Sequence, residues 1–288
     1  MRLRSLLFVP GDRPDQMDKA LGTGADALIL DLEDAVAGQR KAEARLHVAA
    51  FLSRRPRPVR LLVRINPLRE AFADLDLDAI AEAGADGLVL PKAEGDASVR
   101  ELERRLGARN APLPGILPIA TETAAAVFRL SEYDRVAARL IGLTWGAEDL
   151  SAAIGAASSR LADGRFTPPF ETVRALALFA AHAAGVPAIE TVYPAFRDLD
   201  GLADYSARGA RDGFTGMLAI HPSQIPIINA AFTPSAEAIA KARRIVDAFR
   251  SRPGAGVLNL DGVMLDAPHL KHAERVLANA GPGGADLK

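Results

Sequence analysis

The sequence predicts a single (β/α)8 barrel followed by a small helical extension, and three observations support this. Short apolar segments alternate with amphipathic or alanine-rich segments about eight times, which is the pattern of a parallel α/β fold. Eight such units within roughly 230 residues match a (β/α)8 barrel in number and size. Polar residues follow the apolar segments directly, as they do at the catalytic face of such barrels. A doubly wound open sheet is the competing architecture.

The expected strands are the short apolar segments, and the expected helices lie between them. The strands are expected at residues 4–9, 27–32, 59–65, 87–90, 115–119, 140–144, 188–192 and 217–220. The helices are expected at residues 14–21, 41–52, 77–83, 98–106, 171–184 and 199–208. Residues 24–30 also echo residues 84–90, because in each copy a glycine can end a helix before an Asp leads into a strand. This echo supports regular repetition of a βα unit.

Residues 1–233 are expected to form the barrel, and residues 234–288 a C-terminal helical extension. Ser235 fits the N-cap of a helix over residues 236–249, and a break follows at residues 251–256. A short apolar piece, a helix over residues 268–279 and a glycine-rich end that is expected to fray complete the chain. The extension is too small for a core of its own, so we expect it to pack on its own barrel or on a neighbouring subunit.

The composition is that of an ordinary soluble protein. The 288 residues, 49% of them hydrophobic, suffice for one large core. A net charge of -1 gives no general attraction to nucleic acid or to an anionic membrane. The lack of cysteine excludes disulfides, thiolate metal sites and cysteine nucleophiles. The first apolar stretch is too short for a signal peptide and no long uncharged run follows, so a cytoplasmic location is expected.

Residues 140–151 end as a catalytic strand does. Their apolar run stops at Gly146, and Glu148 and Asp149 come directly before a helix-prone segment. Upstream, the apolar run 116–120 leads to Glu122 in a similar way. If the two strands are neighbours in a parallel sheet, Glu122 and Asp149 can face one cation from the same edge. Such an all-oxygen pair favours Mg²⁺ over Zn²⁺, and it is the candidate metal site.

Other polar residues follow the remaining strands, namely Asp31, Glu33, Asp34, Arg64, Asn66, Lys92, Glu94, Glu190, Tyr193 and His221. Arg64 either holds an anion with its planar fork or neutralises the acids around it, and the residues leave both roles open. Lys92 is expected to form ion pairs rather than a Schiff base, because acidic neighbours keep it charged. His221 is expected to be a hydrogen-bonded wall residue. His269 and His272 could share a helix face, but metal binding by them is disfavoured.

The ordered set of strand-end motifs resembles the citrate lyase β-subunit family, which includes citryl-CoA and malyl-CoA lyases within the wider HpcH/HpaI aldolase group. The motifs lie at residues 4–12 (RSLLFVPGD), 30–36 (LDLEDAV), 63–66 (VRIN), 90–92 (LPK), 122–124 (ETA) and 146–150 (GAEDL). Each motif is weak by itself. Their order along nearly the whole chain makes the resemblance specific.

The resemblance implies a Mg²⁺-dependent barrel that cleaves or forms the carbon–carbon bond of a 3-hydroxy-3-carboxyacyl-CoA by retro-Claisen chemistry. Glu122 and Asp149 would bind Mg²⁺, and Arg64 would bind the carboxylate of the oxo-acid half. Two further acids, Glu33 and Asp34, would stand behind the metal site, with Lys92 balancing their charge. Gly146 and Ala147 would also contact the substrate, and Arg13 and Lys19 would meet the phosphates of CoA.

The resemblance also implies a general acid/base, because the thioester enolate released on cleavage must be protonated. Asp266, within residues 262–268, matches an Asp in a lid that covers the active site of the next subunit in a homotrimer. A dry subunit seam could raise its pKa as that role needs, but the residues leave a helix-capping role before Pro268 equally open.

Several functions compete for this sequence. The leading interpretation is a free-standing lyase acting on malyl-CoA, citramalyl-CoA or a related thioester. The chain could also be the β subunit of a citrate lyase complex that uses an acyl-carrier-linked substrate. With water admitted, the same site would make a malyl-CoA thioesterase, and a CoA-binding protein without catalysis is a third class. No nucleic-acid or membrane partner is expected.

Overall fold

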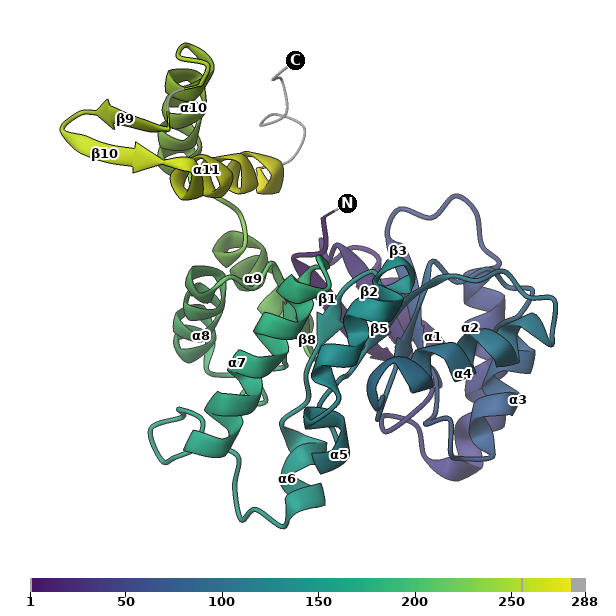
Figure 1. Cartoon of the computed structure of the whole chain (residues 1–288). Helices are drawn as coiled ribbons and strands as arrows, with labels where there is room; N and C mark the ends of the chain where they lie inside the picture. Colours follow the sequence, from purple (N-terminus) through teal and green to yellow (C-terminus); the bar gives the residue numbers. More distant parts are fainter. Residues whose placement is uncertain (1, 255, 281–288) are drawn as a thin grey trace. The chain divides into compact units, whose positions relative to one another are not determined.

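The first unit of the protein is an eight-stranded parallel barrel, seen in a computed structural model that describes residues 2–254 and 256–280 (Figure 1). The strands are β1 (Ser5–Pro10), β2 (Ala27–Asp31), β3 (Arg60–Arg64), β4 (Gly87–Leu90), β5 (Gly115–Pro118), β6 (Leu143–Thr144), β7 (Ala188–Glu190) and β8 (Gly216–Ala219). Their order in the sheet is β5-β4-β3-β2-β1-β8-β7-β6. All eight expected strands are therefore confirmed, with ends that shift by up to three residues.

The sheet closes between its two outer strands, which excludes the open doubly wound alternative. Parallel bridges join Ile116 to Leu140 and Ile119 to Thr144. The Ala120 N–H donates to the Thr144 carbonyl at 2.9 Å, and the Ile141 N–H donates to the Ile116 carbonyl at 3.0 Å. The expected (β/α)8 barrel is confirmed, and β5 and β6 are neighbours.

Helices surround the barrel, with α2, α3 and α4 on one side of the strands and α7 and α8 on the other (Figure 1). They are α1 (Pro14–Ala20), α2 (Lys41–Leu52), α3 (Phe72–Ile80), α4 (Gly95–Gly107), α5 (Ala124–Val127), α6 (Glu148–Ile154), α7 (Pro168–Ala183), α8 (Leu199–Asp212) and α9 (Ile225–Ala231). Helix α3 begins five residues before the expected start at residue 77. Residues 72–76 look like a loop because two of the five are Asp, but Asp76 is buried against Arg45 of α2, and this ion pair favours the helix.

The barrel interior is filled by alternate residues of the strands, as the two-residue period of a strand requires. The buried set includes Leu6, Ile29, Leu62, Val89, Leu117, Ile189 and Leu218. Gly87 and Gly115 leave space for Ile141, since a Cβ at either position would lie within 3 Å of its side chain. Burial of each large aliphatic side chain contributes roughly 1.5–3 kcal/mol. This packing fixes the strand ends that carry the site.

The second unit contains α10 (Ala236–Arg250), a hairpin of β9 (Val257–Leu260) and β10 (Val263–Asp266), and α11 (Ala267–Asn279). Ser235 accepts a hydrogen bond from the Ala238 N–H, so the expected N-cap is confirmed. The hairpin was not expected. Its turn residues Asp261 and Gly262 both have positive φ, as in a type I′ turn, and an Asp-Gly pair between apolar runs is a strong hairpin signal.

The chain divides into two compact units, Leu3–Asn229 and Ala230–Lys288 with Met1–Arg2. The prediction that the extension is too small for a core of its own is wrong, because α10, α11 and β10 enclose a small apolar core that includes Ile245, Val246, Leu265 and Leu277. The glycine-rich end expected to fray lies outside the described residues. Among the residues that are described, no helix is long and apolar enough to cross a membrane.

Candidate active site

The register of β2 and β3 builds the first part of the site. Asp31 is paired with Arg64 across the two strands, at their carboxyl ends. Residues paired in this way point to the same face, so both side chains enter the barrel mouth, by which we mean the side where the strands end. Arg64 donates from Nε and Nη2 to the two oxygens of Asp31, at 2.7 and 2.6 Å. This is a bidentate pair at the edge of the barrel core.

Arg64 has further acidic neighbours, and it lies over an aromatic ring. Its Nη1 lies 3.0 Å from Glu33 Oε2 and 3.6 Å from Asp34 Oδ2, and its guanidinium carbon is 4.7 Å from the centroid of Phe8. Burial acts to lower the pKa of Arg64, but the carboxylates outweigh it and raise the pKa. The contacts of Arg64 therefore fit one of the two roles left open by the sequence, the neutralisation of surrounding acids.

Lys92 connects three carboxylates because its backbone is left-handed. With φ of 51°, its N–H donates to Glu122 Oε2 at 2.5 Å while its side chain turns toward other acids. The Nζ atom donates to Glu33 Oε1 at 2.6 Å and lies 3.3 Å from Asp149 Oδ1. Burial opposes the charge of Lys92, but the hydrogen bond to Glu33 and the nearby carboxylates raise its pKa. A charged lysine fits the ion-pair role and opposes the Schiff-base alternative.

Two carboxyl groups at the mouth, those of Glu122 and Glu33, are buried, and burial disfavours their charged form. Burial, with Glu33 and Asp149 nearby, raises the pKa of Glu122 to about 8. Burial also raises the pKa of Glu33 to about 7, although Arg64 and Lys92 counteract the rise. Each of the two residues is only 4% exposed. A cation placed against Glu122 would remove the repulsion that its charged form meets.

Gly146 brings the ends of β5 and β6 close together. A Cβ at this position would lie 2.8 Å from Glu122 Cγ and 3.2 Å from Ile119 Cγ2. Thr121 holds the same contact with two hydrogen bonds, accepting from the Gly146 N–H at 3.1 Å and donating to its carbonyl at 3.3 Å. Asp149 follows in the first turn of α6. The two acids expected to face one cation are thus carried by adjoining strand ends.

These side chains border a cavity of about 420 Å³. Its polar wall includes Asp31, Asp34, Arg64, Glu122, Glu148 and Asp149, and its apolar wall includes Phe8, Ile119, Trp145, Ala147, Val192, Leu218 and Ile220. Gly146 and Ala147, which the resemblance implies as substrate contacts, line the cavity together with the acids. An apolar wall beside convergent charged groups is typical of a small-molecule site.

The side chains at the mouth carry more acidic than basic groups, which favours binding of a cation. Five carboxylates contact Arg64 or Lys92, namely Asp31, Glu33, Asp34, Glu122 and Asp149. The negative charge of these groups exceeds the positive charge. In the described part of the chain, no three acidic or histidine side chains are arranged around one metal position. Glu122 and Asp149 can therefore supply two ligands, and substrate or water oxygens would complete the coordination, as is usual for Mg²⁺.

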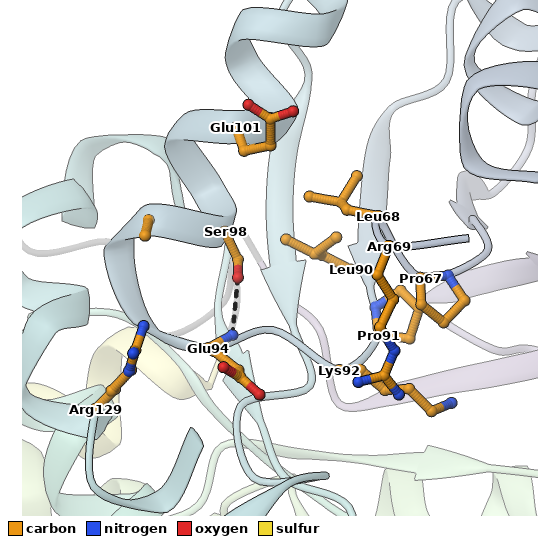
Figure 2. Close-up of a pocket in the computed structure, with 11 residues that line it drawn as sticks. Pro67, Leu68, Arg69, Leu90, Pro91, Lys92, Glu94, Ser98, Glu101 and Arg129 are labelled. Carbon is orange, nitrogen blue, oxygen red and sulfur yellow. Dashed lines mark hydrogen bonds between the residues drawn. The ribbon is translucent and has the colours of Figure 1, made fainter. Parts of the chain in front are cut away.

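A second hollow of about 340 Å³ is lined in part by residues 90–92, the segment that carries Lys92 (Figure 2). Ser98 and Glu101 of α4 line one side, and Leu68 and Arg69 line the other. Ser98 accepts a hydrogen bond from the Glu94 N–H at 2.9 Å, and Glu94 accepts one from Thr123 at 2.8 Å. Glu94 thus supports the segment after Glu122 instead of facing the larger cavity.

Three other strand-end candidates, Asn66, His221 and Glu190, form hydrogen bonds that stabilise the barrel and its loops. Asn66 is buried between Lys41 and Asp76. His221 caps the short 3-10 helix Pro222–Gln224, where its Nδ1 lies 2.7 Å from Ser223 Oγ. Glu190 is fully buried and holds Trp145, whose contribution to the cavity the sequence analysis missed. The position of Trp145 directly before Gly146 was the signal available in the sequence.

Three further residues that the resemblance implies, Arg13, Lys19 and Asp266, contact other partners. Arg13 precedes α1 with its side chain half-exposed, and Lys19 on α1 is exposed beside Asp15 at 3.5 Å. Asp266 is the N-cap residue of α11, and its Oδ1 lies 2.5 Å from His269 Nδ1. This hydrogen bond lowers the pKa of Asp266, opposite to the direction expected for a buried general acid. The helix-capping role left open by the sequence is present.

The fold and the mouth together define a class of protein, a (β/α)8 barrel whose strand ends place carboxylates and Arg64 around one cavity, with Lys92 paired to these acids. Comparison with known families identifies it further. The chain belongs to the HpcH/HpaI aldolase/citrate lyase family, whose model matches residues 4–222. The expected family is confirmed, and it is a family of enzymes.

Relatives within the family carry different activities. A citrate lyase subunit beta-like protein of Mycobacterium tuberculosis is 40% identical, over 96% of this chain and 94% of its own. A (3S)-malyl-CoA thioesterase of Cereibacter sphaeroides is 36% identical over the same shares. The mitochondrial citramalyl-CoA lyase of Mus musculus is 33% identical, over 96% of this chain and 86% of its own. A structure of CitE from M. tuberculosis with magnesium, acetoacetate and coenzyme A matches with a TM-score of 0.81 and 38% identity, covering 96% of this chain and 98% of that one.

Proposed function

We propose that the protein is a Mg²⁺-dependent carbon–carbon lyase that cleaves a 3-hydroxy-3-carboxyacyl-CoA to an oxo acid and acetyl-CoA. The observation that carries the proposal is the pairing of Glu122 and Asp149 at adjoining strand ends, both in contact with Lys92, in a cavity that also holds Arg64. The relatives named above include a CoA lyase and a structure with magnesium and coenzyme A. Malyl-CoA, citramalyl-CoA and citryl-CoA are the candidate substrates.

Glu122 and Asp149 are the residues that would hold the metal. The raised pKa of Glu122 supports this assignment, because a buried carboxylate with one backbone hydrogen bond gains most from an added cation. When bound, Mg²⁺ would act as a Lewis acid on the hydroxyl or ketone oxygen of the substrate. Glu122 must lose its proton before it can act as a ligand.

Arg64 would orient the oxo-acid half of the substrate. Its Nε and Nη2 atoms are already held by Asp31, which fixes the plane of the guanidinium. The Nη1 edge then faces Glu33 and Asp34, and a substrate carboxylate would compete with these acids for it. Asp34 is the weaker competitor because its side chain is 60% exposed and more distant. Lys92 holds Glu33 in place during this exchange through its hydrogen bond of 2.6 Å.

The apolar wall would exclude water from the thioester enolate. Trp145, Val192 and Leu218 line the cavity together with the acids. An enolate that meets no water can be protonated only by a positioned acid, and the products are then acetyl-CoA and an oxo acid. The electron pair of the broken carbon–carbon bond becomes the enolate, and its terminal carbon takes the proton. This wall supports a lyase over a hydrolase.

Asp266 is our proposed donor of that proton, acting from a neighbouring subunit of a trimer. In its own unit the side chain is half-exposed, and His269 lowers its pKa. An acid that protonates an enolate needs a higher pKa, so the proposal requires that the subunit seam bury the carboxyl group or separate it from His269. Arg13, which precedes α1, and Lys19, in its last turn, have exposed side chains and are proposed to meet the phosphates of CoA.

Two other activities stay in competition. The 36% identical malyl-CoA thioesterase supports hydrolysis of the thioester in the same pocket. The citrate lyase β-like relative supports use of an acyl-carrier-linked substrate within a complex. Both would keep the same residues around the metal, because each stabilises negative charge on a thioester fragment.

A coupled assay separates these activities. Purified protein with Mg²⁺ is offered malyl-CoA and citramalyl-CoA separately, and glyoxylate, pyruvate, acetyl-CoA and free thiol are measured. The lyase gives equal amounts of oxo acid and acetyl-CoA without free thiol, and EDTA abolishes the reaction. Free thiol without acetyl-CoA indicates the thioesterase. If neither compound is consumed, the lyase proposal for free CoA thioesters is wrong, and acyl-carrier-linked substrates are tested next.

A further inference from the structure

We infer that Glu190 is a positioning residue for the metal site, acting through the indole of Trp145. The inference rests on the proposed function, because it concerns the segment that carries Asp149. Glu190 is the last residue of β7 and is fully buried, but it does not line the cavity. It lies behind the wall that Trp145 presents to the cavity.

The two oxygens of Glu190 are fully engaged. Oε1 accepts from Trp145 Nε1 at 2.6 Å and from the Thr191 N–H at 3.0 Å. Oε2 accepts from Arg174 Nε at 2.7 Å, and Nη2 of the same guanidinium is also 2.7 Å away. Arg174 in turn pairs with Asp212 at 2.7 Å. The carboxylate therefore has no free position for a substrate, which excludes direct participation in the reaction.

The ion pair gives Trp145 a rigid support. Arg174 belongs to α7, so the pair ties that helix to the end of β7. The indole is fully buried, and its ring meets Phe166 edge to face with centroids 5.0 Å apart. A charge-assisted hydrogen bond of 2.6 Å in a dry environment is strong and directional. The ring of Trp145 is thus held at one end by packing and at the other by a fixed charge.

The segment after Trp145 carries the consequence. Gly146 comes next and packs directly against Glu122, while Asp149 lies in the first turn of α6, four residues after Trp145. A tilt of the indole would move Gly146 relative to Glu122 and change the separation of the two proposed ligands. Partners that orient metal ligands typically affect metal affinity by about 10- to 100-fold. Glu190 touches neither proposed ligand. It is expected to act through Trp145, to which it is hydrogen-bonded, and through Gly146, the next residue in the chain.

The main test uses Trp145→Phe, which keeps an aromatic ring and leaves the pair of Glu190 and Arg174 intact. Mn²⁺ is the probe, with its affinity measured by electron paramagnetic resonance for the full-length protein. We expect affinity to fall by about 10-fold in a variant that still unfolds cooperatively, with a thermal midpoint lowered by the lost hydrogen bond to Glu190. Glu171→Gln is the matched control, since it breaks the ion pair of α7 with Arg208 without touching Trp145 or Glu190. The control should keep wild-type Mn²⁺ affinity.

An affinity of Trp145→Phe within twofold of wild type would overturn the inference. Tryptophan fluorescence is a second readout, and it needs no metal. It reports on Trp145 alone, because Trp145 is the only tryptophan of the chain. Glu190→Gln is expected to increase acrylamide quenching of its fluorescence in metal-free protein, and Glu171→Gln is not. Equal quenching in all three proteins would also overturn the inference. Wild-type protein that binds no Mn²⁺ would instead contradict the proposed function, so the two failures are distinguishable.

Discussion

Glu122 and Glu190 are both buried carboxylates at the ends of barrel strands, yet they differ in how their charge is matched. Glu190 accepts hydrogen bonds from a guanidinium, an indole and a backbone N–H. Glu122 accepts one, from the Lys92 N–H, and it also faces the charges of Glu33 and Asp149. Burial therefore raises the pKa of Glu122 to about 8.

The difference separates a structural acid from a binding acid. A buried carboxylate with a full set of donors stabilises the fold only as long as all of them remain, since loss of one partner leaves an unpaired charge. A buried, charged carboxylate with too few hydrogen-bond donors lowers the free energy of unfolding of the metal-free protein. A bound cation removes this cost. Position at a strand end, which the two residues share, does not distinguish these roles. Their donors do.

The largest expected effect is loss of activity in Asp149→Ala. This change removes one of two proposed metal ligands from a side chain that is partly exposed, so the fold should be preserved. We expect no measurable turnover and no Mg²⁺ binding, with an unchanged circular dichroism spectrum. A variant that keeps more than about a tenth of the wild-type rate would contradict the metal assignment, because a lost ligand typically costs far more than a supporting residue does.

The next effect is a contrast in stability between Glu190→Gln and Glu122→Gln. Glu190→Gln leaves the buried Arg174 with Asp212 alone, so we expect a loss of about 3 kcal/mol in the free energy of unfolding. Glu122→Gln removes a carboxylate that resists ionisation, so metal-free protein above pH 8 should be as stable as wild type or more stable. Urea unfolding in EDTA measures both. Equal destabilisation by the two changes would break the contrast drawn above.

A smaller effect is the pH dependence of the metal-free protein. The pKa of Glu122 is raised to about 8 and that of Glu33 to about 7, so the folded state binds more protons than the unfolded state between about pH 4.5 and 8. Stability from these groups is present below this window and falls as pH rises through it. Glu122→Gln should flatten urea midpoints measured from pH 5 to 9. Glu101→Gln, at an exposed position whose pKa is lowered, is the control and should leave the slope unchanged.

The smallest effect is expected from Asp266→Asn, which leaves the barrel mouth intact. Substrate binding should persist, while exchange of the acetyl methyl protons of acetyl-CoA with solvent should slow. The reason is that an amide cannot move the proton that the enolate carbon gains or loses. Nuclear magnetic resonance in heavy water measures the exchange. Unchanged exchange would reduce Asp266 to its capping position on α11.

The architecture was predictable because its signals are local. Each strand is a short apolar run, and alternation with helices leaves few parallel arrangements to consider. Helix α3 was placed too late because its first turn is acidic, and the stabilising partner Arg45 of Asp76 lies 31 residues upstream. The hairpin of β9 and β10 was missed although its Asp-Gly turn was visible in the sequence.

The site was predictable as a set of residues but not as a set of contacts. Strand ends in a parallel barrel must meet, so Arg64, Lys92, Glu122 and Asp149 could be grouped without coordinates. Lys92 contacts three acids from a left-handed backbone conformation. Nothing about a lysine at this position in the sequence predicts that conformation. The anchoring role of Glu190 depends on Arg174 and Trp145, which are 16 and 45 positions away along the chain.

Gly146 limits how this pocket can be redesigned. Because any side chain at that position would collide with Glu122, a library that varies residue 146 should return almost only glycine among folded, metal-binding proteins. Ala147, Val192 and Leu218 line the same cavity. Changes in substrate preference are therefore best sought at these three wall positions, where shape can vary while the spacing of the acids is retained.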